Sequence, residues 1–259
     1  MKQFILTGEP GGDGRIRLEG GDYQYLVKVR RLAPGEYFPA RLPGGAMVTV
    51  RVVSVDSRAL VGEVAEISPV SAPAESLPHL ILYQALPKSD KMDLIVRQAA
   101  EGAVAEIVPF VSEFSVAKTG AQKIIRWERI IKEARQQSGS PEATVIRQPV
   151  SADGLFSHWD NLKTRWPGIL GLLFHHLPLA NESLHGYLGT RLETNPPEAV
   201  VITIGPEGGF SPAEAERFMA AGFQPFTIGD TVLRTETAAL YAQAAVRILL
   251  LEKNSWKMK

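Results

Sequence analysis

Two glycine-containing turns in the second half of the chain combine residue types that suit the binding of a small ligand. The first, Gly205–Phe210 (GPEGGF), follows the apolar run Ala199–Ile204 and precedes Ser211–Glu214 (SPAE). The SPAE pattern predicts a helix start, because it has the form of a capping box with proline at the first helical position. Gly208 and Gly209 are expected where a side chain would clash with a ligand or where φ is positive. A tight strand–helix connection without any ligand explains the same pattern.

The second turn repeats this arrangement nearer the carboxyl terminus. In FTIGDTVLRTETAAL (226–240), a short strand is expected before Gly229 and a long helix from about Thr235–Thr237. The apolar run GILGLLF (168–174) ends at His175-His176 and is a natural neighbour. Ligands bind at the carboxyl ends of parallel strands, so the three loops are expected to meet around one pocket. Backbone amides with apolar walls suit an adenosine-bearing cofactor, whereas neither loop has the spacing of the common dinucleotide or phosphate motifs.

The elements that must position these turns form a parallel α/β domain. Apolar runs at 79–86, 105–110, 168–174 and 199–204 alternate with helical patterns at 89–103 and 120–137, and this rhythm predicts a parallel sheet covered by helices. Residues 1 to about 70 instead predict a small β-barrel, with strands at 36–41, 46–55 and 58–67 separated by turn residues. The segment Ser68–Pro78 contains three prolines and is expected to be a linker.

Composition limits the function classes. A length of 259 residues is comfortable for two domains, and 28 basic against 28 acidic residues leave any nucleic-acid surface to local patches. The absence of cysteine excludes disulfides, cysteine–zinc sites and a cysteine nucleophile, and it fits a reducing cytoplasm. No signal peptide core or apolar run of membrane-spanning length occurs, so a soluble cytoplasmic protein is expected. The adjacent His175 and His176 lack a third partner at ligand spacing, so no metal site is expected.

The motifs ITIGPEGGFSPAEAERF and IGDTVLRTETAAL resemble those of the bacterial RsmE family, which methylates uracil N3 of 16S ribosomal RNA and belongs to the SPOUT superfamily. PKSDKMDLIVRQAAE, AEIVPFVSEFSV and EARQQSG follow in family order, so the resemblance extends over nearly the whole chain. It implies S-adenosylmethionine as the cofactor and a homodimer. It also implies a PUA-like, RNA-binding β-barrel at 1–72, followed by a SPOUT-type α/β domain with a deep trefoil knot at 73–259. The substrate would be 16S rRNA, either free or within the small ribosomal subunit.

The resemblance also assigns site residues. The cofactor contacts that it implies are Leu173, Phe174, His175, Gly205, Pro206, Glu207, Gly208, Gly209, Ile228, Gly229, Val232, Leu233, Arg234, Thr235, Glu236, Thr237 and Ala238. The expected RNA contacts are Lys28, Arg30, Arg31, Lys88, Lys123 and Arg126. For the basic residues of the helix 120–137, a solvated face opposite Ile124, Trp127, Ile131 and Ala134 explains the pattern as well as phosphate contact does.

Arg234 is the candidate catalytic residue. Methylation at pyrimidine C5 needs a thiolate adduct, whereas N3 needs only proton loss and alignment with the sulfonium methyl. A fixed guanidinium beside a uracil carbonyl oxygen would favour the anion. Arg234 could instead pair with Glu236 or Glu207 and hold the loops. Glu207 and Glu236 are themselves expected to brace the loops by accepting backbone N–H bonds rather than to act as bases.

The chain also departs from the family pattern. Gly102-Ala103 stands where Leu-Gly is usual, Phe114 and Ser140 stand where arginines are common, and Val29-Arg30-Arg31 replaces Val-Leu-Arg. Two alternatives therefore stay open: a SPOUT enzyme for another RNA nucleotide, and a ribosome-assembly RNA-binding protein without turnover. The helix from Ala238 to Leu251 is apolar nearly all round, which predicts that a second subunit covers part of it.

Overall fold

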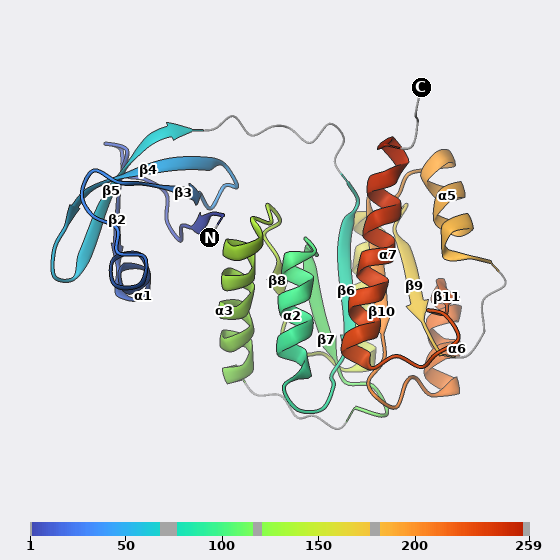
Figure 1. The fold of residues 1–259 in the computed structure, drawn as a ribbon. Coiled ribbons are helices and arrows are strands. Elements are labelled where there is room, and N and C mark those ends of the chain that lie inside the picture. Colours follow the sequence, from blue (N-terminus) through green and yellow to red (C-terminus); the bar gives the residue numbers. More distant parts are fainter. Residues whose placement is uncertain (1, 68–76, 116–120, 177–181, 256–259) are drawn as a thin grey trace. The chain divides into compact units, whose positions relative to one another are not determined.

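The computed structural model describes residues 2–67, 77–115, 121–176 and 182–255 (Figure 1). The chain folds into two compact units. The first takes Met1–Ala74 and Arg135–Pro141, and the second takes Glu75–Ala134 and Glu142–Lys259. The expected linker Ser68–Pro78 lies outside the described residues except for its last two positions. No helix within the described part of the chain has the length and apolar character needed to cross a bilayer.

The first unit is built on a five-stranded sheet with the order β1-β3-β4-β5-β2. The strands are β1 (Phe4–Ile5), β2 (Arg15–Glu19), β3 (Tyr37–Arg41), β4 (Met47–Val55) and β5 (Ala59–Ile67). Alternate residues are buried along β2 and β3, as expected of a sheet with one face on a core. The short helix α1 (Gly20–Tyr23) continues into the π-helical turn η1 (Gln24–Val29), whose Leu26 is fully buried in that core. The strands expected at 36–41, 46–55 and 58–67 are confirmed, whereas β1 and β2 were not predicted.

The second unit is built on a six-stranded sheet with the order β11-β9-β10-β6-β7-β8, in which every pair is parallel. The strands are β6 (His79–Ala85), β7 (Glu106–Phe110), β8 (Val145–Ile146), β9 (Leu170–Phe174), β10 (Ala199–Ile204) and β11 (Phe223–Phe226). Every residue of β9 and β10 is buried, because helices cover both faces of the sheet. The predicted parallel α/β architecture is therefore confirmed.

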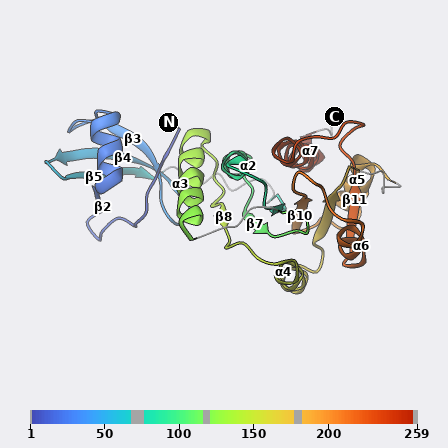
Figure 2. The same ribbon diagram turned by 90° about the horizontal axis from the view of Figure 1, so that it is seen from below.

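Two helical layers cover this sheet. The helices are α2 (Lys91–Glu101), α3 (Ala121–Ser138), α4 (Ala152–Arg165), α5 (Leu184–Thr194), α6 (Pro212–Ala220) and α7 (Thr235–Ser255). Side chains of α2, α3, α5 and α7 share one apolar core, and those of α4 and α6 share the other. Figure 2 shows α4 and α6 on the opposite side of the sheet from α2 and α7. In α3 the predicted inward face is confirmed, since Ile124, Trp127, Ile131 and Ala134 are buried.

Two local features of the second unit differ from the sequence expectation. The strand expected at about Phe226–Ile228 ends at Phe226 and begins at Phe223. Gly222, with φ +99°, ends α6, so the strand can begin directly after it. Pro225 is tolerated within β11 because β11 is an edge strand. Ala103 takes the left-handed conformation, with φ +58°, at the position where the family resemblance expects glycine. This conformation is strained for a residue with a Cβ.

Candidate active site

A cavity of about 290 Å³ lies where the loops after β9, β10 and β11 meet. These strands are parallel neighbours, so their carboxyl ends lie at one edge of the sheet. The capping box predicted from Ser211 and Glu214 is present and starts α6 directly after the first glycine turn. Lining residues of the cavity are Phe174, His175, His176, Ile204, Gly205, Pro206, Glu207, Gly208, Gly209, Phe210, Ile228, Gly229, Thr231, Val232, Leu233, Thr235 and Ala238.

The structure brings most of the expected cofactor residues together around this cavity. The exceptions are Leu173, which is buried in the core on the α4–α6 face, and Arg234, Glu236 and Thr237, which lie beside the cavity at the start of α7. Four lining residues, His176, Ile204, Phe210 and Thr231, were not predicted, although each is adjacent to a predicted residue or motif. That these residues hold a cofactor stays a prediction.

The two adjacent glycines of the first turn have different surroundings. Gly209 has φ +72°, its N–H donates to the Pro206 carbonyl at 2.9 Å, and a Cβ there would lie 3.2 Å from His176 Nδ1. This residue fits the expectation of a positive φ. At Gly208 φ is not positive, and an added Cβ would lie 3.0 Å from the Cβ of Phe114. A larger residue at position 208 is therefore disfavoured by the Phe114 side chain and not by the backbone conformation.

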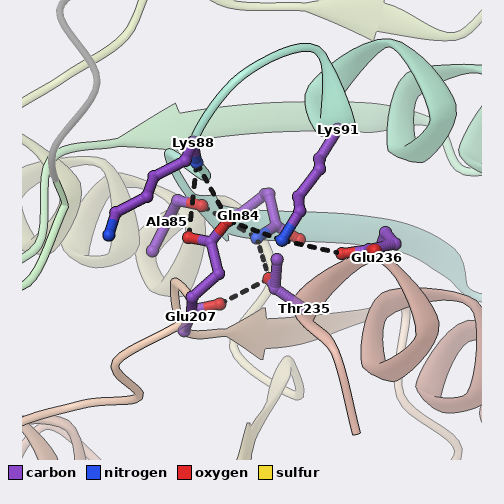
Figure 3. A network of polar contacts seen from close by, with 8 residues as sticks. Gln84, Ala85, Lys88, Lys91, Glu207, Thr235 and Glu236 are labelled. Carbon is purple, nitrogen blue, oxygen red and sulfur yellow. Dashed lines mark hydrogen bonds and ion pairs between the residues drawn. The ribbon is translucent and has the colours of Figure 1, made fainter.

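A buried chain of hydrogen bonds joins the strand ends (Figure 3). Thr235 Oγ1 donates to the Gly205 carbonyl at 2.7 Å and accepts from Gln84 Nε2 at 3.1 Å. Gln84 is fully buried at the end of β6 and also donates to the Ala85 carbonyl at 2.8 Å. The first residue of α7 is thereby fixed to both β6 and the glycine turn that follows β10.

Lys91 connects the first glycine turn to the first turn of α7 by electrostatic contacts. Its Nζ lies 2.8 Å from Glu207 Oε1 and 3.6 Å from Glu236 Oε2 (Figure 3). Glu207 also accepts from the backbone N–H of Lys88, so it braces the loop after β6. The hydrogen bond to Glu207 raises the pKa of Lys91, although desolvation opposes this. Burial acts to raise the pKa of Glu207, but the bonds from Lys91 and backbone N–H groups outweigh it and the pKa is lowered. Both groups are thus held charged.

Arg234 has an exposed side chain next to this network. The ion pairs of Glu207 and Glu236 go to Lys91, and no ion pair of the Arg234 guanidinium occurs among the residues that the structure describes. The alternative in which Arg234 pairs with either carboxylate is therefore not what the structure adopts. His176, which lines the cavity, is exposed and stacks on His175, with ring centroids 4.6 Å apart.

The expected RNA-contacting residues lie in both units. In the first unit Lys28, Arg30 and Arg31 are exposed at the end of η1, and Arg31 has φ +59°.

In the second unit Lys88 is exposed and Lys123 half-buried, while Arg126 is exposed and pairs with Asp93. Asp93, in the first turn of α2, also accepts a hydrogen bond from Trp127 Nε1 at 3.0 Å. Part of the charge of Arg126 is therefore neutralised by Asp93 within the protein.

Across the described ranges, no group of three or more histidine or acidic side chains is placed to hold a metal ion.

Comparison with known proteins identifies relatives of the whole chain. A family model described as an RNA methyltransferase domain matches residues 74–247. The ribosomal RNA small subunit methyltransferase E of Aquifex aeolicus is 30% identical over 231 residues, which cover 86% of this chain and 90% of that protein. The protein of the same name from Synechocystis is 29% identical over 96% of this chain and 78% of its own length.

Solved structures include similar chains with a bound cofactor. The ribosomal RNA small subunit methyltransferase E from Neisseria gonorrhoeae, bound to S-adenosylmethionine, is 26% identical, with a TM-score of 0.80 over 96% of this chain and 98% of that chain. A putative methyltransferase from Legionella pneumophila in complex with the same cofactor is 28% identical, with a TM-score of 0.79 over 95% of this chain and 98% of that chain.

Proposed function

Since the chain belongs to the ribosomal RNA small subunit methyltransferase E family of RNA methyltransferases, we infer that it transfers the methyl group of S-adenosylmethionine to N3 of a uridine in 16S rRNA. The observation that carries this proposal is the cavity itself. It is formed by the two glycine turns whose motifs match the family, and similar chains bind this cofactor.

The cavity fits the cofactor chemically. Phe174, Ile228 and Leu233 offer apolar surface for an adenine ring, and the glycine positions leave backbone groups accessible to its polar atoms. When bound, S-adenosylmethionine supplies an electrophilic methyl group on its sulfonium. The protein's part is to hold the target nitrogen in line with that methyl group and to favour loss of the N3 proton.

We propose Arg234 as the residue that favours this proton loss. Its exposed guanidinium stands at the edge of the cavity without an internal ion pair among the described residues, so its charge is available to a substrate. Placed beside a uracil carbonyl oxygen, it would stabilise the negative charge that spreads there as N3 ionises. Because arginine stays protonated, it acts electrostatically and not as the base.

The experiment that tests the function is mapping of 16S rRNA methylation. RNA from a strain lacking the gene should lose one N3-methyluridine, and the purified protein with labelled cofactor should restore it. Arg234→Ala should lower kcat by about 10²–10³-fold, and Arg234→Lys should restore part of the rate. Raising the pH should partly rescue Arg234→Ala. A loss of cofactor affinity in proportion to rate, without rescue by pH, would make Arg234 a loop-supporting residue instead.

We propose the domain organisation that the resemblance implies. Residues 1–72 form a PUA-like barrel that binds RNA, and residues 73–259 form the knotted catalytic domain. The five-stranded sheet and the exposed Arg30 and Arg31 support the first part. The hydrogen bond from Thr235 to Gly205 in the loop after β10, together with the cavity that both loops line, supports the second part. Weaker rRNA binding by an Arg30→Ala, Arg31→Ala variant tests the first part, and a chain trace through 199–238 in an experimental density map tests the second.

We propose that the protein works as a homodimer. Helix α7 buries Ala239, Ala242 and Val246 against its own sheet but leaves Tyr241 54% and Ile248 50% exposed. Apolar side chains on such a helix are stabilised when a second subunit covers them. Sedimentation at micromolar concentration tests this assembly.

A further inference from the structure

Phe114 is an exposed aromatic residue beside the cavity. It lies in the loop after β7 and is 44% exposed. Its Cβ is 3.0 Å from the position that a Cβ on Gly208 would occupy, so the ring base packs directly on the first glycine turn. Phe114 does not itself line the cavity, but it lies against Gly208, which does.

The loop that presents Phe114 is held in place from two sides. Ser115 N–H donates to the Ser112 carbonyl at 3.0 Å, and Ser112 N–H donates to Ser115 Oγ at 3.1 Å, which closes a tight turn around Phe114. Glu113 N–H donates to Glu214 Oε1 at 2.8 Å, which ties the turn to the capping box of α6. The backbone that carries Phe114 is thus held in place before a ligand arrives, and this lowers the entropic cost of binding to the loop.

Lys88 contacts the same glycine turn through its backbone. The backbone N–H of Lys88 donates to Glu207 at 3.1 Å, so Lys88 and Phe114 contact successive residues of the same turn. Figure 3 shows the Lys88 side chain extending away from the Lys91 network. Its ammonium makes no ion pair within the described ranges, and the residue is exposed. An aromatic face together with a free cation is the combination that binds single-stranded nucleic acid.

We propose that Phe114 is a stacking platform for an unpaired base of the substrate RNA and that Lys88 contacts a phosphate of the same segment. The proposal rests on the proposed function and narrows its substrate to an unpaired stretch. Uracil N3 lies on the Watson–Crick edge, so a paired uridine cannot present it to a methyl donor. A nucleotide turned out of its stack loses contact with its neighbours, and an aromatic ring at the mouth of the cavity replaces that contact.

Kinetic measurements on a 16S rRNA transcript test the platform. Phe114→Leu keeps an apolar side chain against Gly208 but removes the ring, and it should raise the KM for RNA about 5- to 150-fold, as expected for loss of one base–aromatic stack. Phe114→Trp should retain the wild-type KM. The matched control is Val145→Ala. Val145 is also exposed and apolar, but it pairs with Glu106 at the amino end of β7, away from the cavity, and the variant should behave as wild type.

The salt dependence of RNA binding distinguishes the role of Lys88 from that of Phe114. Lys88→Gln should lower the slope of log K for RNA against log salt by about 0.7, because one fewer phosphate is neutralised. Phe114→Leu should leave that slope unchanged, since stacking releases no counterion. Affinity for S-adenosylmethionine, measured by calorimetry, should be the same in both variants as in the wild type.

The outcomes distinguish this proposal from the proposed function. If the wild type methylates the transcript and Phe114→Leu has an unchanged KM for RNA, the platform is refuted while the function stands. If Phe114→Leu loses affinity for S-adenosylmethionine by the same factor as its KM for RNA rises, Phe114 supports Gly208 and the proposal is likewise overturned. If the wild type transfers no methyl group to RNA, the proposed function fails. Binding of a 12-nucleotide oligouridylate then decides on the platform, which requires weaker binding by Phe114→Leu than by Phe114→Trp.

Discussion

Replacing Lys91 by methionine tests whether its ammonium holds the first glycine turn and the start of α7 together. The variant keeps most of the side-chain volume but removes the charge that lies 2.8 Å from Glu207 and 3.6 Å from Glu236. Both carboxylates are then left without their cation, and one oxygen of Glu236 is already buried without a hydrogen bond among the described residues. We expect a less stable protein with lower affinity for S-adenosylmethionine.

The magnitude follows from the exposure of the three side chains, which is 30% for Lys91, 25% for Glu207 and 14% for Glu236. Fully exposed pairs contribute about 0.2–1 kcal/mol, and breaking a fully buried pair costs about 3–5 kcal/mol. A partly screened network lies between these limits, so the expected loss is about 1–2 kcal/mol. This loss corresponds to a factor of about 5–30 in an equilibrium constant.

Calorimetric titration with S-adenosylmethionine and urea unfolding measure the effect. Lys91→Arg should recover part of the affinity, whereas the matched control Lys163→Met should change little. Lys163 pairs with Asp160 on the surface of α4, where the two side chains are 45% and 69% exposed. In a double-mutant cycle with Glu207→Gln the two effects should not be additive. Additive effects, or a Lys91→Met protein with wild-type affinity and stability, would refute the reasoning.

The pH dependence of this contribution has a defined sign. The pKa of Glu207 is lowered from 4.5, so its contribution is present above that value and is lost as the pH falls through the lowered pKa. The pKa of Lys91 is raised from 10.5, so its contribution is present below that value and is lost as the pH rises through the raised pKa. The difference between wild type and Lys91→Met should therefore be constant between about pH 5 and pH 10.

Three further variants test other parts of the structure. Gly209→Ala should lower the free energy of unfolding by about 1–2 kcal/mol, since φ is +72° and the new methyl group meets His176; cofactor affinity should fall with it, and unchanged calorimetry would contradict this. Tyr83→Phe removes the bond of 2.7 Å to His158 Nδ1 on the α4–α6 face; it should cost about 1–2 kcal/mol in urea unfolding without altering cofactor affinity. Tyr241→Lys should give a monomer in sedimentation, and a persisting dimer would exclude this face of α7 from the interface.

The elements that the sequence predicted well are those with strong local patterns. The fully apolar runs of β9 and β10, the capping box at Ser211 and the start of α7 at Thr235 each depend on a few adjacent residues. The two-residue strands β1 and β8 are too short to carry a pattern.

The glycine turns of the site were predictable, but the contacts that fix them were not. Gln84 and Lys91 are separated from Thr235 and Glu207 by more than a hundred residues, and nothing local marks them as partners. The same holds for Phe114 against Gly208, since only the fold places the loop after β7 beside the loop after β10. Sequence patterns identify the residues that make up the cavity, whereas the residues that hold them depend on strand order.

The bond between Gln84 and Thr235 sets an earliest time at which the site can exist during protein synthesis. The two residues are 151 positions apart in the chain. A ribosome adding about 5–20 residues per second needs about 8–30 s to pass from one to the other. Throughout that interval β6 has already been made, but α7 has not. Helix α7 belongs to the core that includes Leu82 and Ile202 on one face of the sheet. The nascent chain must therefore leave the part of this face that α7 covers exposed until α7 is made, and the bond that fixes the cavity can form only after synthesis has passed Thr235.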